Sequence, residues 1–340
     1  MVLVCLPLPS THASGAWTPQ RSGTLAWLHD VHFLDQNRGW AIGGSGVLLA
    51  TEDGGKNWQM RRRPTPDALR DIYFIDAQTG WLVCERSVYL LKAKDEPRAY
   101  LMRTTDAGAT WTRVDIKDSD VDIRLVRIMF ANNSELGWVF GETGGLFMTR
   151  DGGTSWTRQR IPTRRLLLDG AFVGDRQGWI VGTGATLLRT TDAGETWLAD
   201  VPVDTANTRL NAVAFVNERR GWAVGAAGRV FATVDGGRTW RARDSNVQAD
   251  LYDVKFINET EGWAVGAEGT VIHTTDGGIS WSTESSGTSH SLERLWIVDR
   301  THGWAVGFGG TIIAYTTLKV PSQQPQLKGV TVGGSLTRGR

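Results

Sequence analysis

Six aspartates each begin the same short motif, Asp-Gly/Ala-Gly-x-x-Trp. Carboxylates that recur at regular spacing are of the type that bind a metal ion or act as general acids and bases. The motif favours a local role, because a short carboxylate accepts hydrogen bonds from the amides of its own turn and glycine tolerates a positive φ. We therefore predict a structural role for all six: Asp53, Asp106, Asp151, Asp192, Asp235 and Asp276.

Arginine is the residue type whose placement suggests recognition of a partner. Its planar guanidinium group forms two parallel charge-assisted hydrogen bonds with a carboxylate. Five arginines stand at the starts of predicted inner strands and two more in a connection, although Asp71, Asp169 and Asp253 at neighbouring positions are able to neutralise them. The candidate binding residues are Arg70, Arg124, Arg127, Arg209, Arg294, Arg164 and Arg165.

Composition excludes several function classes. The chain has 340 residues, a formal net charge of +1 and 41% hydrophobic residues, so no nucleic-acid partner is indicated. It contains no apolar run near the ~20 residues that span a membrane, so we expect the protein to be peripheral to a membrane at most. We also expect it to be a monomer. The six histidines are scattered without ligand spacing, so we predict no metal and no cofactor.

The elements that must position these residues are repeats. Glycine followed by tryptophan recurs at intervals of 41, 57, 41, 43, 41 and 41 residues, which marks seven units. Each unit contains four short runs rich in Val, Ile, Thr, Phe and Trp, separated by Gly, Asn and Asp. This pattern predicts an all-β, seven-bladed propeller with four-stranded antiparallel blades. The tryptophans that mark the units are Trp40, Trp81, Trp138, Trp179, Trp222, Trp263 and Trp304.

The two ends of the repeat region complete one blade. Only six Asp motifs occur, and residues 12–17, HASGAW, resemble the missing one, so an N-terminal strand should close the ring and place Trp17 beside Trp304. Residues 1–13 are apolar and resemble a truncated signal peptide. We therefore predict a leader at 1–13, a propeller at 14–317 and a disordered basic tail at 318–340, with a periplasmic or secreted location.

One face of the predicted propeller carries the arginines. A leucine five residues before the aromatic or aliphatic anchor opens every inner strand and should be core, while its polar neighbours vary from blade to blade. The interblade connections and the long insertion of the second blade lie on this face, and the Asp motifs lie on the opposite one. The leucines are Leu28, Leu69, Leu125, Leu167, Leu210, Leu251 and Leu292.

The repeated GW-A-V-G and D-G-G-x-T/S-W motifs over residues 14–317, behind an apolar leader, resemble the photosystem II stability and assembly factor family. This resemblance implies a non-enzymatic factor that holds a client membrane protein, through an acidic segment or C-terminus, by an arginine patch. It also implies a thylakoid-lumen location if the host is photosynthetic.

The alternative is an enzyme of the sialidase-like or other Asp-box glycoside hydrolase type. A sialidase-like site would combine three arginines, a tyrosine nucleophile beside a glutamate, and an aspartate acid/base. Tyr252, on an inner strand, is the candidate nucleophile. The Arg160-Ile161-Pro162 tripeptide resembles a sialidase motif, but it follows the third Asp motif rather than preceding the first, so we expect no enzymatic activity.

Overall fold

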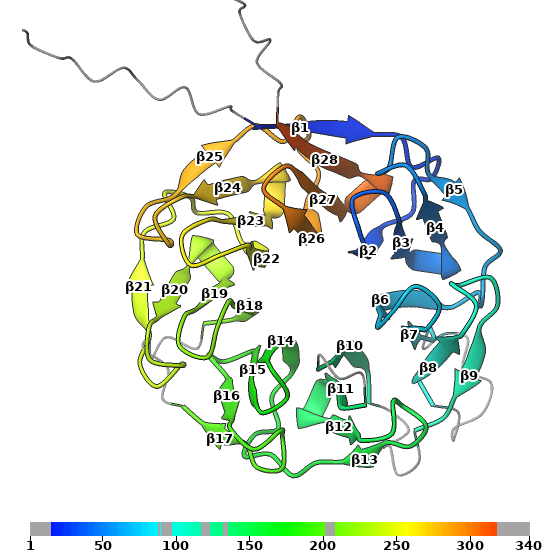
Figure 1. Cartoon of the computed structure of the whole chain (residues 1–340), viewed down its shortest axis with the longest axis horizontal. Helices are drawn as coiled ribbons and strands as arrows, with labels where there is room; N and C mark the ends of the chain where they lie inside the picture. Colours follow the sequence, from blue (N-terminus) through cyan, green and yellow to red (C-terminus); the bar gives the residue numbers. More distant parts are fainter. Residues whose placement is uncertain are drawn as a thin grey trace, which may run out of the picture.

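The structure is a computed structural model that describes residues 15–87, 89, 97–116, 123–131, 135–200 and 208–317. In these ranges the chain forms seven four-stranded antiparallel sheets, arranged as blades around a central axis (Figure 1). The predicted seven-bladed propeller is confirmed. No helix in the described ranges is both long and apolar enough to cross a membrane. The leader predicted at 1–13 and the tail predicted at 318–340 lie outside the described residues.

Each blade runs from an inner strand at the axis to an outer strand at the rim (Figure 1). The inner strands are β2 (Leu28–Phe33), β6 (Ala68–Phe74), β10 (Leu125–Phe130), β14 (Leu167–Val173), β18 (Leu210–Phe215), β22 (Leu251–Phe256) and β26 (Leu292–Asp299). The second strands are β3 (Gly39–Gly43), β7 (Gly80–Glu85), β11 (Gly137–Gly141), β15 (Gln177–Gly182), β19 (Gly221–Gly225), β23 (Gly262–Gly266) and β27 (His302–Gly307). The third strands are β4 (Leu48–Thr51), β8 (Ala99–Thr104), β12 (Leu146–Thr149), β16 (Leu187–Thr190), β20 (Val230–Thr233), β24 (Val271–Thr274) and β28 (Ile312–Thr317). The outer strands are β5 (Gln59–Met60), β9 (Thr112–Val114), β13 (Thr157–Arg158), β17 (Leu198–Ala199), β21 (Arg241–Arg243), β25 (Ser282–Glu284) and β1 (Gly15–Gln20).

Stacked aromatic side chains join neighbouring blades. Trp222 on β19 stacks on Phe256 of the next blade, with ring centroids 3.5 Å apart and planes 5° apart. Trp304 on β27 stacks on Phe33 of the first blade in the same way, at 3.5 Å. The anchor leucines of all seven inner strands are also buried, as the sequence predicts. The core therefore lies between blades, and the repeated tryptophan forms much of it.

The N-terminal strand closes the ring as predicted. β1 pairs antiparallel with β28, from Gly15 opposite Thr317 to Gln20 opposite Ile312. The predicted neighbour of Trp17 is wrong: Trp17 packs with Trp263 and Tyr315, whereas Trp304 belongs to the core shared with the first blade. The reason is the register, because β1 adds outside β28 and its Trp17 side chain points toward the sixth blade.

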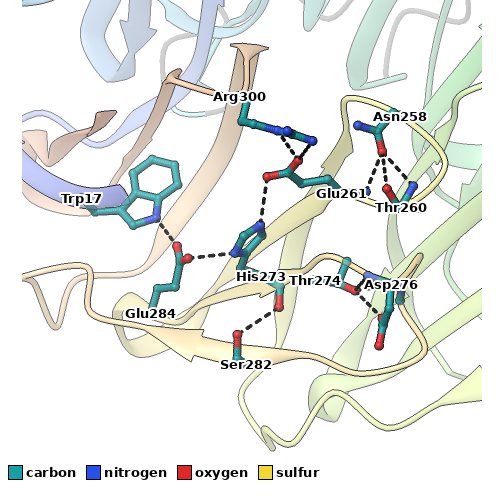
Figure 2. A network of polar contacts seen from close by, with 11 residues as sticks. Trp17, Asn258, Thr260, Glu261, His273, Thr274, Asp276, Ser282, Glu284 and Arg300 are labelled. Atoms are coloured by element: carbon teal, nitrogen blue, oxygen red, sulfur yellow. Dashed lines mark hydrogen bonds and ion pairs between the residues drawn. The ribbon is translucent and has the colours of Figure 1, made fainter. Parts of the chain in front are cut away.

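The Asp motifs form closed hydrogen-bonding loops within their own turns. Asp276 accepts the backbone N–H and the hydroxyl of Ser280 at 3.0 and 2.6 Å. It also accepts the hydroxyl of Thr274 at 2.8 Å (Figure 2). The other five Asp motifs repeat this arrangement, except that the side-chain amide of Asn57 replaces a hydroxyl donor at Asp53. In the second blade, the hydroxyl and backbone N–H of Thr110 lower the pKa of Asp106 to about 2. Each of these carboxylates therefore accepts hydrogen bonds within its own turn.

Candidate binding pocket at the channel mouth

A β-bulge occurs near the start of every inner strand. In β18, Leu210 pairs with Gly225 and Ala212 with Val224, so Asn211 is an extra residue between them. The same shift follows the anchor leucine in the other six inner strands. A bulge re-aims a side chain that would otherwise follow the pleat. The residue after each anchor leucine lies at this bulge, and all seven of these residues line one central pocket.

Close backbone packing fixes the start of these strands. The amide of Ala226 donates to the carbonyl of Arg209 at 3.0 Å, and a Cβ at Gly225 would lie 2.0 Å from that carbonyl oxygen. Only glycine fits there, which explains the last glycine of the GW-A-V-G motif. The backbone that carries Arg209 is therefore held rigidly at the channel mouth.

The pocket at this mouth has a volume of about 260 Å³. Because all seven blades contribute, it lies on the propeller axis, on the face of the interblade connections. Its residues are Trp27, His29, Arg70, Arg124, Leu125, Val126, Leu168, Arg209, Asn211, Tyr252, Glu293 and Arg294. We call it the arginine pocket.

The four arginines of the pocket differ in their partners. Arg70 Nε donates to Glu85 Oε2 at 2.6 Å, and Arg124 Nε lies 3.2 Å from Glu142 Oε1. Neither Arg209 nor Arg294 forms an ion pair with any residue that the structure describes. These two guanidinium groups therefore remain available to an anionic ligand.

The other ionisable groups leave the pocket positive. Burial lowers the pKa of His29 to about 3, and the cations Arg70 and Arg294 add to this effect, so the ring is neutral at physiological pH. Burial also raises the pKa of Glu293 above its ordinary value, although Arg294 opposes this shift. Glu293 is the one carboxylate among the lining residues, against four arginines.

Arg127 does not line the pocket. Its side chain is 12% exposed, its Nε donates to Asp169 at 2.8 Å and its Nη1 to Asp71 at 2.6 Å. The neutralisation by neighbouring aspartates that the sequence allowed therefore occurs at this arginine. Burial and the Asp71 carboxylate raise the pKa of the nearby Asp30 well above its ordinary value.

Arg127 and these aspartates share one repeat position, two residues after the anchor leucine, where aspartate joins adjacent blades. Asp169 Oδ2 accepts the backbone N–H of Val213 in the next blade at 3.0 Å. Three other aspartates make the equivalent bond, and sequence reasoning missed this role. The pairs are Asp30 with Ile72, Asp71 with Ile128 and Asp253 with Leu295.

The structure thus brings four of the seven predicted arginines into the pocket and leaves three outside it. The four are Arg70, Arg124, Arg209 and Arg294. Arg164 and Arg165 are exposed in the connection before β14 and do not line the pocket. Sequence reasoning missed most of the remaining lining residues. The signal that identifies six of them is their position directly after the anchor leucines.

The glycosidase alternative is only partly matched. Tyr252 and Glu293 do lie in the pocket with the arginines, but no aspartate lines it to act as acid/base. Burial and the carboxylates of Glu293 and Asp250 raise the pKa of Tyr252 above its ordinary value. Within the described ranges, no group of His, Cys, Asp and Glu side chains is arranged to hold a metal ion.

Fold and pocket define the class: an Asp-box propeller with an arginine-lined channel mouth. The profile of the family described as photosynthesis system II assembly factor YCF48 matches residues 9–97, 62–164, 156–242, 198–285 and 238–317. The chain belongs to this family, as the resemblance implied.

Individual relatives agree with this assignment. The chloroplastic photosystem II stability/assembly factor HCF136 of Cyanidioschyzon merolae is 39% identical over 61 residues, which cover 17% of this chain and 14% of that relative. A solved structure of YCF48 bound to D1 peptide has a TM-score of 0.72 at 19% identity, covering 93% of this chain and 99% of that one. YCF48 from Cyanidioschyzon merolae has a TM-score of 0.71 at 17% identity, covering 90% and 100%.

Enzymes share the fold as well. The GH74 xyloglucanase of Xanthomonas campestris has a TM-score of 0.70 at 15% identity, over 90% of this chain and 54% of that one. At such identities the structural likeness shows the fold alone, so the function must be argued from the pocket.

Proposed function

We propose that this protein is a non-enzymatic scaffold of the photosystem II assembly factor type, which holds a client membrane protein by an acidic segment or C-terminus in the arginine pocket. The observation that carries this proposal is the convergence of four arginines from four blades on one central pocket. Arg209 and Arg294 lack an ion pair with any described residue. A carboxylate bound there would form charge-assisted hydrogen bonds in a partly desolvated site.

The comparisons support a peptide ligand. A YCF48 structure of the same fold is described as bound to D1 peptide. We propose that the present chain likewise binds a peptide segment, as a monomer. We also propose a periplasmic or secreted location, or the thylakoid lumen in a photosynthetic host, on the basis of the apolar residues 1–13. Fractionation of cells that produce the full chain tests the location, and recovery in the cytosol would contradict it.

Charge reversal tests the binding function. Peptides that represent the C-terminal ends of the host's envelope membrane proteins are titrated against the wild type and an Arg209→Glu/Arg294→Glu variant. Because a hydrogen bond to a charged group contributes roughly 1.5–3 kcal/mol, we expect affinity to fall at least ~10-fold and the salt dependence to weaken. The matched control is Arg219→Glu/Arg238→Glu, which makes the same charge change at two exposed arginines on the opposite face.

Two results would overturn the proposal. One is that no peptide of the panel binds the wild type. The other is that the pocket variant, folded normally by circular dichroism, binds the same peptides with the same affinity and salt dependence as the wild type.

A further inference from the structure

Two large aromatic side chains are exposed beside the arginine pocket. Trp27, in the connection before β2, is 45% exposed, and Phe308, in the turn between β27 and β28, is 52% exposed. Their rings contact each other edge-on, with centroids 5.7 Å apart. Since Trp27 also lines the arginine pocket, the apolar surface formed by Trp27 and Phe308 begins at the pocket wall.

The repeat shows that packing does not require these aromatic residues. The position of Trp27, directly before the anchor leucine, holds Ala68 in the second blade and Arg209 in the fifth. The position of Phe308, directly after the GW-A-V-G motif, holds Ala226 in the fifth blade and Ala267 in the sixth. The same turns form with small residues, so the aromatic pair is a local departure from the repeat.

Both rings are held in place before any ligand arrives. The Trp27 ring packs against the His29 ring, with centroids 5.4 Å apart, and its backbone carbonyl accepts the amide of Gly44 at 2.9 Å. Phe308 contacts the His290 ring edge-on at 5.7 Å, and His290 Nδ1 lies 2.8 Å from the hydroxyl oxygen of Thr311. A rigid aromatic surface loses little conformational entropy on binding.

We infer that the Trp27–Phe308 surface is a second subsite for the client, which takes an apolar side chain close to a terminal carboxylate held by the arginines. This inference rests on the proposed function. An extended peptide advances ~3.3 Å per residue, so an apolar side chain within about three residues of the carboxylate reaches the adjacent surface. The client is therefore a chain terminus that combines a carboxylate with a nearby apolar residue, rather than a purely acidic segment.

A pair of synthetic peptides tests this inference. Both are acidic and end in a free carboxylate, and they differ only in carrying leucine or serine near the terminus. The protein variant is Trp27→Ala/Phe308→Ala, which introduces residues that other blades hold at these positions. We expect the wild type to prefer the leucine peptide ~10-fold, and the variant to bind the two peptides with equal affinity.

The outcomes separate this inference from the function on which it rests. If the wild type does not prefer leucine, or the alanine variant keeps the preference, the subsite is wrong. If only the Arg209→Glu/Arg294→Glu variant loses binding, the proposed function stands without the subsite. If charge reversal has no effect, the proposed function fails first. Sedimentation velocity tests whether a second copy of this chain occupies the Trp27–Phe308 surface instead. A wild-type dimer that the alanine variant abolishes would overturn the inference.

Discussion

Trp17 Nε1 donates a hydrogen bond to Glu284 Oε2 at 2.8 Å, joining residues 267 positions apart in the chain. Glu284 Oε1 in turn lies 3.0 Å from His273 Nδ1, and a second acidic residue of the same blade, Glu261, pairs with Arg300 (Figure 2). The N-terminal strand is thus bound to its own blade by the β1–β28 ladder and to the sixth blade by side chains. Ring closure has two independent components.

Substitutions of Trp17 separate these components. Trp17→Phe keeps an aromatic ring but removes the indole donor to Glu284 Oε2, so we expect a loss of about 1–2 kcal/mol in the free energy of unfolding. Trp17→Ala also removes the buried ring and should cost ~3–5 kcal/mol. Urea unfolding measures both. Trp281→Phe is the control, at a buried tryptophan whose Nε1 has no hydrogen-bond partner among the described residues, and equal losses for the two phenylalanine variants would refute the role of the Trp17 hydrogen bond.

The aspartates that follow the bulges should also contribute to stability. Asp169→Ala removes the acceptor of the Val213 amide and one of the two short ion pairs of the buried Arg127. We expect a loss of ~3–5 kcal/mol, because a buried charge then lacks part of its compensation. Asp253→Ala should cost less, ~1–3 kcal/mol, because the Lys255 that it pairs with is more exposed than Arg127. Thermal unfolding gives the order, and the reverse order would contradict this account.

Substitution of an aspartate in an Asp motif should lower the stability of the protein without changing its binding. Asp235→Ala leaves the backbone N–H and the hydroxyl of Thr239 without their acceptor, which should lower the free energy of unfolding by about 1–3 kcal/mol. Peptide affinity should not change, because this turn lies on the face opposite the arginine pocket. Reduced affinity in a variant of normal stability would give Asp235 a functional role instead.

Much of the fold followed from the sequence because the repeat determines it. The interval between GW motifs gave the blade count, and the missing Asp motif gave the closing strand, β1. Residue periodicity does not reveal a bulge, however, so the different orientations of Arg127 and the arginines nearby could not be predicted. A bulge after each anchor leucine places Arg70 in the pocket. Arg127 and Arg294 share the next strand position, but Arg127 pairs with Asp71 and Asp169, whereas Arg294 lines the pocket.

Buried His32 predicts a pH dependence of stability. Burial lowers its pKa to about 3, Arg127 adds to this effect, and the backbone N–H of Phe74 donates to Nε2 at 3.4 Å. Below the ordinary pKa of 6.5, the unfolded chain therefore binds a proton that the folded protein does not. This residue lowers the free energy of unfolding as pH falls, by up to ~1.4 kcal/mol per pH unit.

A His32→Gln variant isolates this effect, because glutamine accepts a hydrogen bond but does not titrate. Between pH 7 and pH 5, the wild type should lose ~2 kcal/mol of stability relative to the variant. Other groups that titrate, including His29 and Asp30, cancel in this comparison. Urea unfolding at each pH measures the difference, and parallel stability curves would show that His32 keeps its ordinary pKa in the fold.

The last prediction concerns catalysis by Tyr252, the residue that the glycosidase alternative requires. A tyrosine nucleophile must lose its proton, but burial and the carboxylates of Glu293 and Asp250 raise the pKa of Tyr252. A second carboxyl group for acid/base work is also missing from the lining residues. We therefore expect no hydrolysis of sialosides or xyloglucan above the rate without protein, and Tyr252→Phe should change peptide affinity less than Arg209→Glu does. Turnover by the purified wild type that Tyr252→Phe abolishes would establish an enzyme and overturn the scaffold function.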